Sequence, residues 1–163
     1  LLARFEPAYR RYGYLGHWYR AAEKPIRERE YDHGSRVGLG WVIKKRKSRT
    51  DVKSWTVDVN FWKTALQNQL AARVGSPGAV TFYDGKHRML AEHITSEFGT
   101  PTEGRGRTVI EWRLKPGHDN HWLDTTVGCL VLGSVSGCNV PEYSDAVERK
   151  RKRRVRRKTE VRT

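Results

Sequence analysis

The stretch W-T-V-D-V-N-F-W-K-T-A-L-Q-N-Q-L-A-A-R-V, residues 55–74, joins two periodic patterns without a break. The β-branched and aromatic residues of its first part predict a strand over 55–59. The rest, 61–74, consists mostly of good helix formers with an apolar side chain at every fourth position, a spacing that lies along one face of a helix. Asp58 or Asn60 can cap the helix start. The stretch therefore predicts the strand-then-helix unit of an α/β domain.

The sequence on either side extends this pattern. Short β-rich or alternating runs predict strands, apolar residues at helical spacing predict helices, and polar glycine-containing runs predict loops. The expected elements are a strand at 41–43, a strand at 79–83, a helix at 87–98, a loop at 100–107, a strand at 108–114 and a helix at 124–135. The order predicts an α/β fold in which strands and helices alternate.

Residues 1–36 show neither a helical nor a strand period. Aromatic residues alternate there with arginines, for example around Tyr12 and Trp18, and glycines divide the segment into short pieces. Such aromatics can anchor a peripheral segment to a core, or they can stack on nucleic-acid bases. Both interpretations stay open.

The positive charge is concentrated at two places. Residues 149–162 hold ten of the 32 Lys and Arg residues, and the formal net charge of the whole chain is +14. This tail has no apolar face, so we expect residues 144–163 to be disordered and 1–143 to form one α/β domain. The second place is the run 44–54, the expected tip of a hairpin, which can contact a phosphate backbone or can be an ordinary solvated loop. The predicted DNA-binding residues are Lys44, Lys45, Arg46, Lys47, Arg49, Arg151, Arg153 and Arg154.

Membrane insertion is not expected, because no apolar stretch approaches the roughly 18 residues that a spanning helix needs. Cys129 and Cys138 are the two cysteines of the chain. A disulfide-stapled domain usually carries more cysteines in a shorter chain, so we expect two buried free thiols in a reducing compartment.

The stretch 117–138 begins with four side chains that could carry chemistry, His118, Asp119, His121 and Asp124, and continues as an apolar run. The two histidines could bind a metal with Asp119 and Asp124 as further ligands, but a zinc site is disfavoured, because such sites normally need a fourth defined ligand and neither cysteine lies at a paired short spacing. Asp124 can instead serve as a first-turn residue that benefits from the dipole of the following helix. No phosphate-binding loop and no serine-nucleophile motif is present.

The remaining candidate chemistry uses carboxylates. Two-metal nucleases gather carboxylates from separate strands and helices around Mg²⁺ or Mn²⁺. Asp58 and Asp124 are the leading acids, with Glu97 and Glu111 as alternatives. Spacing alone leaves open whether these acids converge.

Five segments in order resemble the nuclease part of lambda-type phage terminase large subunits. They are W-T-V-D-V-N-F-W-K-T-A-L-Q-N-Q-L (55–70), S-P-G-A-V-T-F-Y (76–83), I-T-S-E-F (94–98), V-I-E-W-R (109–113) and D-N-H-W-L-D-T-T-V-G-C-L-V (119–131). The resemblance covers roughly residues 36–138 and implies a ribonuclease H-like mixed sheet flanked by helices. It also implies metal-dependent cutting of double-stranded viral DNA in the cytoplasm of an infected host cell, with the terminase small subunit and the portal as partners.

By this resemblance Asp124 matches the family's late acidic residue, a candidate metal ligand, and Asn120 matches the asparagine before it. The role of Asp58 is not assigned by the match. We predict Asp124, Asp58 and His121 as catalytic residues, and Asp124, Asp58 and Asp119 as ligands of Mg²⁺ or Mn²⁺.

The match also has gaps. The family's ATP-driven translocation domain and the first acidic strands of its nuclease sheet have no counterpart in this sequence, and Leu1 is not a methionine. We therefore expect the C-terminal part of a terminase, without the full set of carboxylates. The alternative function is a non-catalytic basic module that binds nucleic acid.

Overall fold

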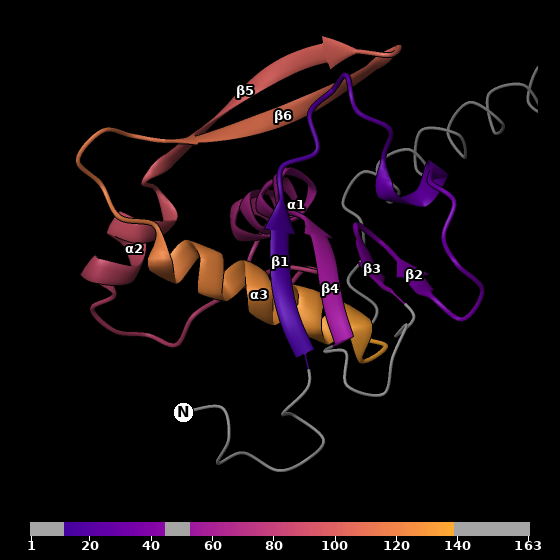
Figure 1. The fold of residues 1–163 in the computed structure, drawn as a ribbon. Coiled ribbons are helices and arrows are strands. Elements are labelled where there is room, and N and C mark those ends of the chain that lie inside the picture. The colour runs from indigo at the N-terminus through magenta and orange to yellow at the C-terminus, as the bar shows by residue number, and fades with distance from the viewer. Residues whose placement is uncertain (1–11, 45–52, 139–163) are drawn as a thin grey trace, which may run out of the picture.

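Figure 1 shows a mixed α/β fold in the computed structural model, which describes residues 12–44 and 53–138. This part consists of a four-stranded mixed sheet, a separate hairpin and three α-helices. The strands are β1 (Tyr12–His17), β2 (Arg36–Gly38), β3 (Trp41–Ile43), β4 (Lys53–Asp58), β5 (Glu97–Gly104) and β6 (Arg107–Leu114). The helices are α1 (Val59–Ala71), α2 (Arg88–Ile94), α3 (His121–Val135) and the short 3-10 helix η2 (Ile26–Glu28). The predicted α/β class is confirmed.

Some predictions lie outside the described residues. These are the disordered tail over 144–163, the domain boundary after 143 and most of the basic loop. None of the helices in the described ranges combines the length and the apolarity that crossing a membrane requires.

The sheet has the strand order β1-β4-β3-β2. β4 pairs in parallel with β1, from Tyr12↔Lys53 to His17↔Asp58, and antiparallel with β3. The strands on either side of the basic loop are therefore antiparallel, as the hairpin prediction required. β1 was not predicted, because its order comes from pairing with β4 and not from a local pattern.

The turn between β2 and β3 requires a glycine. Gly40 has a φ of +64°, a region that L side chains rarely adopt. Its carbonyl accepts hydrogen bonds from the Asp58 N–H (2.9 Å) and from Trp62 Nε1 (3.1 Å). The turn thus fixes the β2–β3 hairpin to the start of α1.

Helix α1 follows β4 directly, as predicted, although it begins at Val59 and ends at Ala71 rather than covering 61–74. Of the two possible caps, Asp58 occupies the N-cap, and its side chain accepts a hydrogen bond from the Phe61 N–H. Such a cap satisfies one of the amide groups that every helix start leaves without an intrahelical partner.

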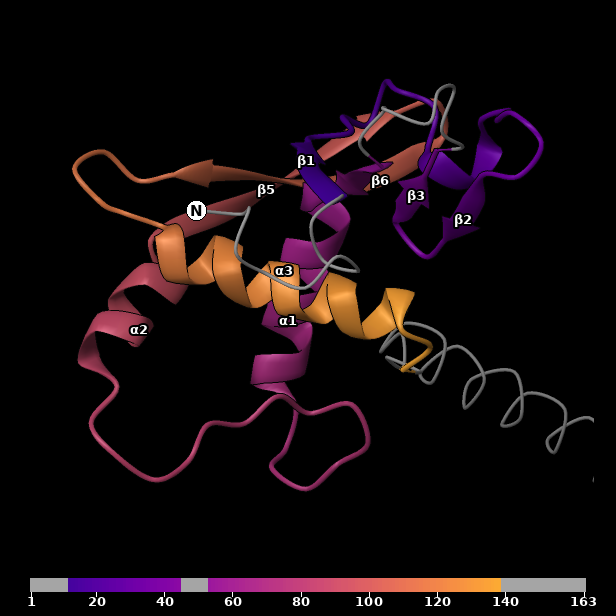
Figure 2. The ribbon, with the colours of Figure 1, turned by 60° about the horizontal axis from the view of Figure 1, so that its bottom comes forward.

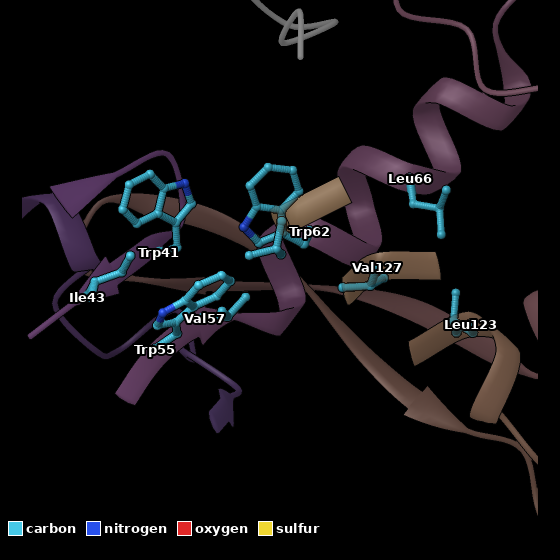
Figure 3. Packing of buried hydrophobic residues seen from close by; sticks show 9 residues of the cluster. Trp41, Ile43, Trp55, Val57, Trp62, Leu66, Leu123 and Val127 are labelled. Carbon is cyan, nitrogen blue, oxygen red and sulfur yellow. The ribbon is translucent and has the colours of Figure 1, made fainter. Parts of the chain in front are cut away.

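The core forms where α1 and α3 cross over the sheet (Figure 2). Each helix contributes apolar side chains at a spacing of three to four residues, and the sheet contributes two tryptophans and two aliphatic residues (Figure 3). The buried members are Trp41, Ile43, Trp55, Val57, Trp62, Leu66, Leu123, Val127 and Val131. Burying a side chain of this kind contributes roughly 1.5–3 kcal/mol, so the helix crossing is a main source of stability.

Helix α3 begins three residues earlier than predicted and keeps Asp124 in its first turn. The prediction of buried thiols is wrong, because Cys129 and Cys138 are both exposed. Val127 and Val131 face the core. At about 100° per residue, Cys129 midway between them points to the opposite side of the helix.

The prediction of a loop over residues 100–107 is wrong. These residues form most of β5 and the turn into β6, and the two strands pair from Glu97↔Leu114 to Gly104↔Arg107. The two-residue turn Arg105-Gly106 has positive φ at both positions, as tight hairpins need, but lacks the Asn-Gly signal that would have announced it.

Two further predictions needed correction. Residues 79–83 form no strand and run as irregular chain. The helix predicted over 87–98 covers only Arg88–Ile94, because Glu97 and Phe98 already belong to β5. The strands therefore come mainly before α1 and after α2 and do not alternate with helices, since cross-strand pairing overrides the short local patterns.

Candidate active site

Lys63 is the centre of a charged cluster that joins three elements. Its ammonium lies 2.5 Å from Glu97 Oε1 at the start of β5 and 3.0 Å from Asp124 Oδ1 in the first turn of α3. Asn120, the residue before α3, donates from Nδ2 to the same Glu97 oxygen at 2.7 Å. We call these four residues, Lys63, Glu97, Asn120 and Asp124, the Lys63 cluster.

Lys63 is placed by the packing of α1. It follows Trp62, which is buried in the core, and its own side chain is only 1% exposed. A buried ammonium is costly unless it is paired, and a carboxylate from each neighbouring element supplies the pairing. The ion pairs thus hold β5 and α3 against α1.

Glu97 is the buried acid of the cluster, with a side chain 3% exposed. Its Oε1 accepts from Lys63 and from Asn120. Its Oε2 is buried and has no hydrogen-bond partner among the described residues. Buried carboxylate oxygens normally have a partner, so this oxygen has an unused capacity to accept a hydrogen bond or to bind a cation.

Asp124 is the open acid of the cluster. Its side chain is 52% exposed although it contacts the buried Lys63 ammonium. The start of α3 adds a favourable dipole for negative charge. The cluster therefore has one carboxylate more than it has cations, and one of its acids faces solvent.

Two histidines, one from α2 and one from α3, lie beside each other. The rings of His93 and His121 have centroids 6.1 Å apart, and the Trp122 N–H donates to His93 Nδ1 at 3.3 Å. The exposed His121 also lies 3.9 Å from Asp119 Oδ1. His121 and Asp119 thus lie at the start of the same helix as Asp124, on its exposed side.

Asp58 has a different environment. Its Oδ1 accepts from the Phe61 N–H at 3.0 Å, and the residue is 8% exposed. Burial raises the pKa of this carboxyl from an ordinary value of 3.8 to about 6, against the opposing effects of the Phe61 N–H, Arg107 and His17. The structure therefore gives Asp58 a capping contact.

In the part of the chain that the structure describes, two of the predicted metal ligands, Asp58 and Asp119, make no hydrogen bond or ion pair with the Lys63 cluster. Within residues 12–44 and 53–138, no group of three or more His, Cys, Asp or Glu side chains is close enough to hold a metal ion together. The pair that does converge is Asp124 and Glu97, the second of which sequence reasoning held only as an alternative.

The other alternative acid, Glu111, lies on β6 beside a surface pocket and does not belong to the Lys63 cluster. Of the predicted DNA-binding residues, Lys44 follows β3 and is exposed, whereas Lys45, Arg46, Lys47, Arg49, Arg151, Arg153 and Arg154 lie outside the described residues.

Sequence reasoning missed Lys63 and His93 as members of the site. Lys63 stands one position after the core residue Trp62, where a lysine normally reads as part of a solvated face. The signal that could have found it is a lone cation in the apolar half of a helix, which needs buried acids as partners.

One family model matches the chain. It is described as "Terminase large subunit gpA, endonuclease domain", and it covers residues 40–146, more than half of the 163 residues. The matched range includes all four residues of the Lys63 cluster. Comparison with curated proteins and with solved structures gives no match.

Proposed function

We propose, from the premise that the chain belongs to the family of terminase large subunit gpA endonuclease domains, that the Lys63 cluster is its active centre. There a phosphodiester bond of double-stranded viral DNA would be cut during genome packaging. The family supplies the class of reaction and the DNA substrate. The cluster supplies candidate residues for it.

The observation that carries this proposal is the convergence of Glu97 and Asp124 on one buried ammonium. The two carboxylates come from β5 and α3, far apart in the sequence, and both lie within 3.0 Å of Lys63 Nζ. One acid would be enough to neutralise the buried ammonium. The second, half-exposed acid gives the cluster access to a substrate.

The residues of the cluster fit Mg²⁺ or Mn²⁺. Magnesium is usually held by one or two carboxylates and retains several waters, so two acids suffice where three are not available. Glu97 Oε2, buried and without a partner among the described residues, and the exposed Asp124 carboxylate would hold the ion. A bound divalent ion would activate water and offset negative charge on the phosphate.

The protein groups have separate tasks in this proposal. Lys63 balances the buried carboxylate when no cation is bound and places a positive charge beside the phosphate. Asn120 orients Glu97 through its 2.7 Å hydrogen bond. The candidate proton donors to the leaving oxygen are His121, in the same helical turn as Asp124, and His93, whose ring lies beside that of His121.

Several finer features belong to the proposal through the family resemblance. They are the ribonuclease H-like fold, binding of the terminase small subunit and the portal, and action in the cytoplasm of the infected host cell. The division into a domain over 1–143 and a basic tail, with DNA bound by the basic loop and tail, also belongs here. Roles of Asp58, Asp119 and His121 in metal binding or catalysis stay predictions.

Plasmid cleavage tests the proposal. The whole chain is incubated with supercoiled plasmid in Mn²⁺ or in EDTA, and nicking is followed on gels for the parent, Asp124→Asn and Glu97→Gln. We expect metal-dependent nicking that each substitution reduces by roughly 100-fold. Glu92→Gln is the matched control, because Glu92 is also a half-exposed carboxylate paired with a cation, Arg88, but lies outside the cluster.

Nicking by Asp124→Asn at the parent rate would refute the assignment of the active centre. An absence of cleavage with any divalent ion, together with DNA binding that falls steeply with salt, would favour the alternative of a non-catalytic nucleic-acid-binding module.

A further inference from the structure

A second surface feature borders α1, the helix that carries Lys63. It is a pocket of about 360 Å³ between the chain that leaves β1, the first turn of α1 and the middle of β6. The residues that line it are Trp18, Arg20, Asn60, Glu111, Trp112 and Arg113. Its volume is in the range of small-ligand sites, and neither the core nor the Lys63 cluster accounts for its composition.

The walls of this pocket are held in place by Asn60. Asn60 is 2% exposed, and its side-chain oxygen accepts from the Trp112 N–H at 3.1 Å while its amide donates to the Tyr19 carbonyl at 3.4 Å. The Trp112 indole also donates to Thr64 Oγ1 at 2.9 Å. One buried amide thus ties the three segments that surround the pocket.

The far end of the β5–β6 hairpin is fixed to the same segment (Figure 1). Arg107 donates from Nη2 to the Arg20 carbonyl at 2.9 Å, and it also donates to the Glu23 carbonyl. A Cβ on Gly104 would lie 2.8 Å from backbone atoms of Ala21 and Ala22. The pocket is therefore a preformed feature, which lowers the cost of binding.

The side chains at the pocket suit a nucleotide. Trp18 is 54% exposed, although the next residue, Tyr19, is 4% exposed and belongs to the core. An exposed indole offers a flat surface on which a base can stack. The exposed residues Arg20 and Arg113 can contact phosphates, and the Glu111 carboxylate can accept a hydrogen bond from a base N–H.

The pocket and the Lys63 cluster share two elements. Asn60 and Lys63 are three residues apart on α1, about 4.5 Å along its axis. Arg113 directly precedes Leu114, the register partner of Glu97. A DNA strand whose phosphate lies at the cluster can therefore place a neighbouring nucleotide at the pocket.

We propose that this pocket binds a single unpaired base of the DNA strand, next to the phosphate that is cut, with Trp18 as the stacking surface. The inference rests on the proposed function for its substrate class. It adds that the substrate is locally unpaired, because a base inside a duplex has both faces covered and cannot stack on Trp18.

Binding in EDTA tests the pocket without reference to cleavage. Fluorescence anisotropy measures the affinity of the whole chain for a labelled oligothymidine of about ten nucleotides and for an abasic sugar-phosphate strand of equal length. We expect Trp18→Ala to weaken oligothymidine binding about tenfold and to leave abasic-strand binding within about twofold. Trp18→Phe, which keeps an aromatic face, should restore most of the loss.

Tyr83→Ala is the matched control, since Tyr83 is an aromatic residue 81% exposed in the irregular chain between α1 and α2, outside the pocket and the Lys63 cluster. It should leave oligothymidine binding within about twofold. The inference fails if oligothymidine does not bind, if Trp18→Ala changes nothing, if it weakens both strands equally, or if Tyr83→Ala causes the same loss. If the chain binds bases through Trp18 but never cuts DNA, the proposed function is wrong and the inference about the pocket still holds.

Discussion

Asp58 and Asp124 both lie near the start of a helix, Asp58 at the N-cap of α1 and Asp124 in the first turn of α3, but their surroundings differ. Each stands at the start of a helix that packs in the core, and each was predicted as a catalytic metal ligand. Asp58 is buried, and one of its oxygens accepts the Phe61 N–H. Asp124 is half-exposed, and one of its oxygens contacts the Lys63 ammonium.

The difference shows what separates a structural acid from a candidate active-site acid. A helix start attracts carboxylates for its own stability, so position alone does not indicate function. Asp58 accepts a hydrogen bond from a first-turn N–H of the helix that follows it. Asp124 instead contacts the Lys63 ammonium of α1, which also pairs with Glu97 of β5. The following predictions test this contrast.

The largest expected effect comes from Lys63→Met. The substitution leaves the buried Glu97 carboxylate without its cation, and breaking a buried pair in this way costs about 3–5 kcal/mol. Urea unfolding followed by tryptophan fluorescence measures the loss. The double variant Lys63→Met/Glu97→Gln removes the uncompensated charge and should recover much of the stability. A single variant within about 1 kcal/mol of the parent would show that the pair contributes little.

The next effect is a pH dependence that belongs to Asp58. Its carboxyl has a pKa near 3.8 when unfolded and about 6 when folded, so between these values the folded chain binds more protons than the unfolded chain. Stability from this group is therefore present below about pH 4 and is lost as the pH rises through about 6. The change amounts to at most about 3 kcal/mol, at 1.36 kcal/mol per pKa unit.

Asp58→Asn should remove this dependence while keeping the cap, because asparagine is also a good N-cap. The measurement is the difference between the parent and variant unfolding free energies from pH 4 to pH 7, in which contributions from other groups cancel. Parallel profiles would contradict the raised pKa.

Substitution of the two acids should have different effects on the cleavage rate. The larger effect is about 100-fold, equivalent to about 2.7 kcal/mol. Asp124→Asn should lose metal-dependent nicking to this extent, while Asp58→Asn should stay within about threefold of the parent because its contacts serve the helix. The assay is single-turnover plasmid nicking in Mn²⁺. Equal losses from both substitutions would place Asp58 in the active centre with Asp124, as the sequence-based prediction has it.

The smallest expected effect separates the stability that comes from the cap hydrogen bond of Asp58 from the effect of its charge. Asp58→Ala removes the acceptor for the Phe61 N–H and should cost about 1 kcal/mol at pH 7, relative to Asp58→Asn. Urea unfolding of the two variants at one pH measures this difference. The same comparison at Asp124, between alanine and asparagine, should show a smaller change, since no cap hydrogen bond to a side chain is present at the start of α3.

Local sequence patterns predicted the elements that are stabilised by residues close to one another in the chain. The strand at Trp41–Ile43, the β4–α1 unit and the apolar helix that carries Asp124 were found because apolar periodicity and capping residues act over a few positions. Strands that depend on a distant partner were missed. β1 is ordered by β4, and β5 is ordered by β6 across an Arg-Gly turn that has no strong signal of its own.

The sequence by itself determined the α/β class, the order of motifs that marks the terminase nuclease family and the position of Asp124 in the first turn of a helix. Only the tertiary structure decided that Glu97, and not Asp58, shares a cation with Asp124. The reason is physical. Periodicity records interactions between near neighbours in the chain, whereas the Lys63 cluster exists because α1, β5 and α3 pack around one buried ammonium that each acid helps to neutralise.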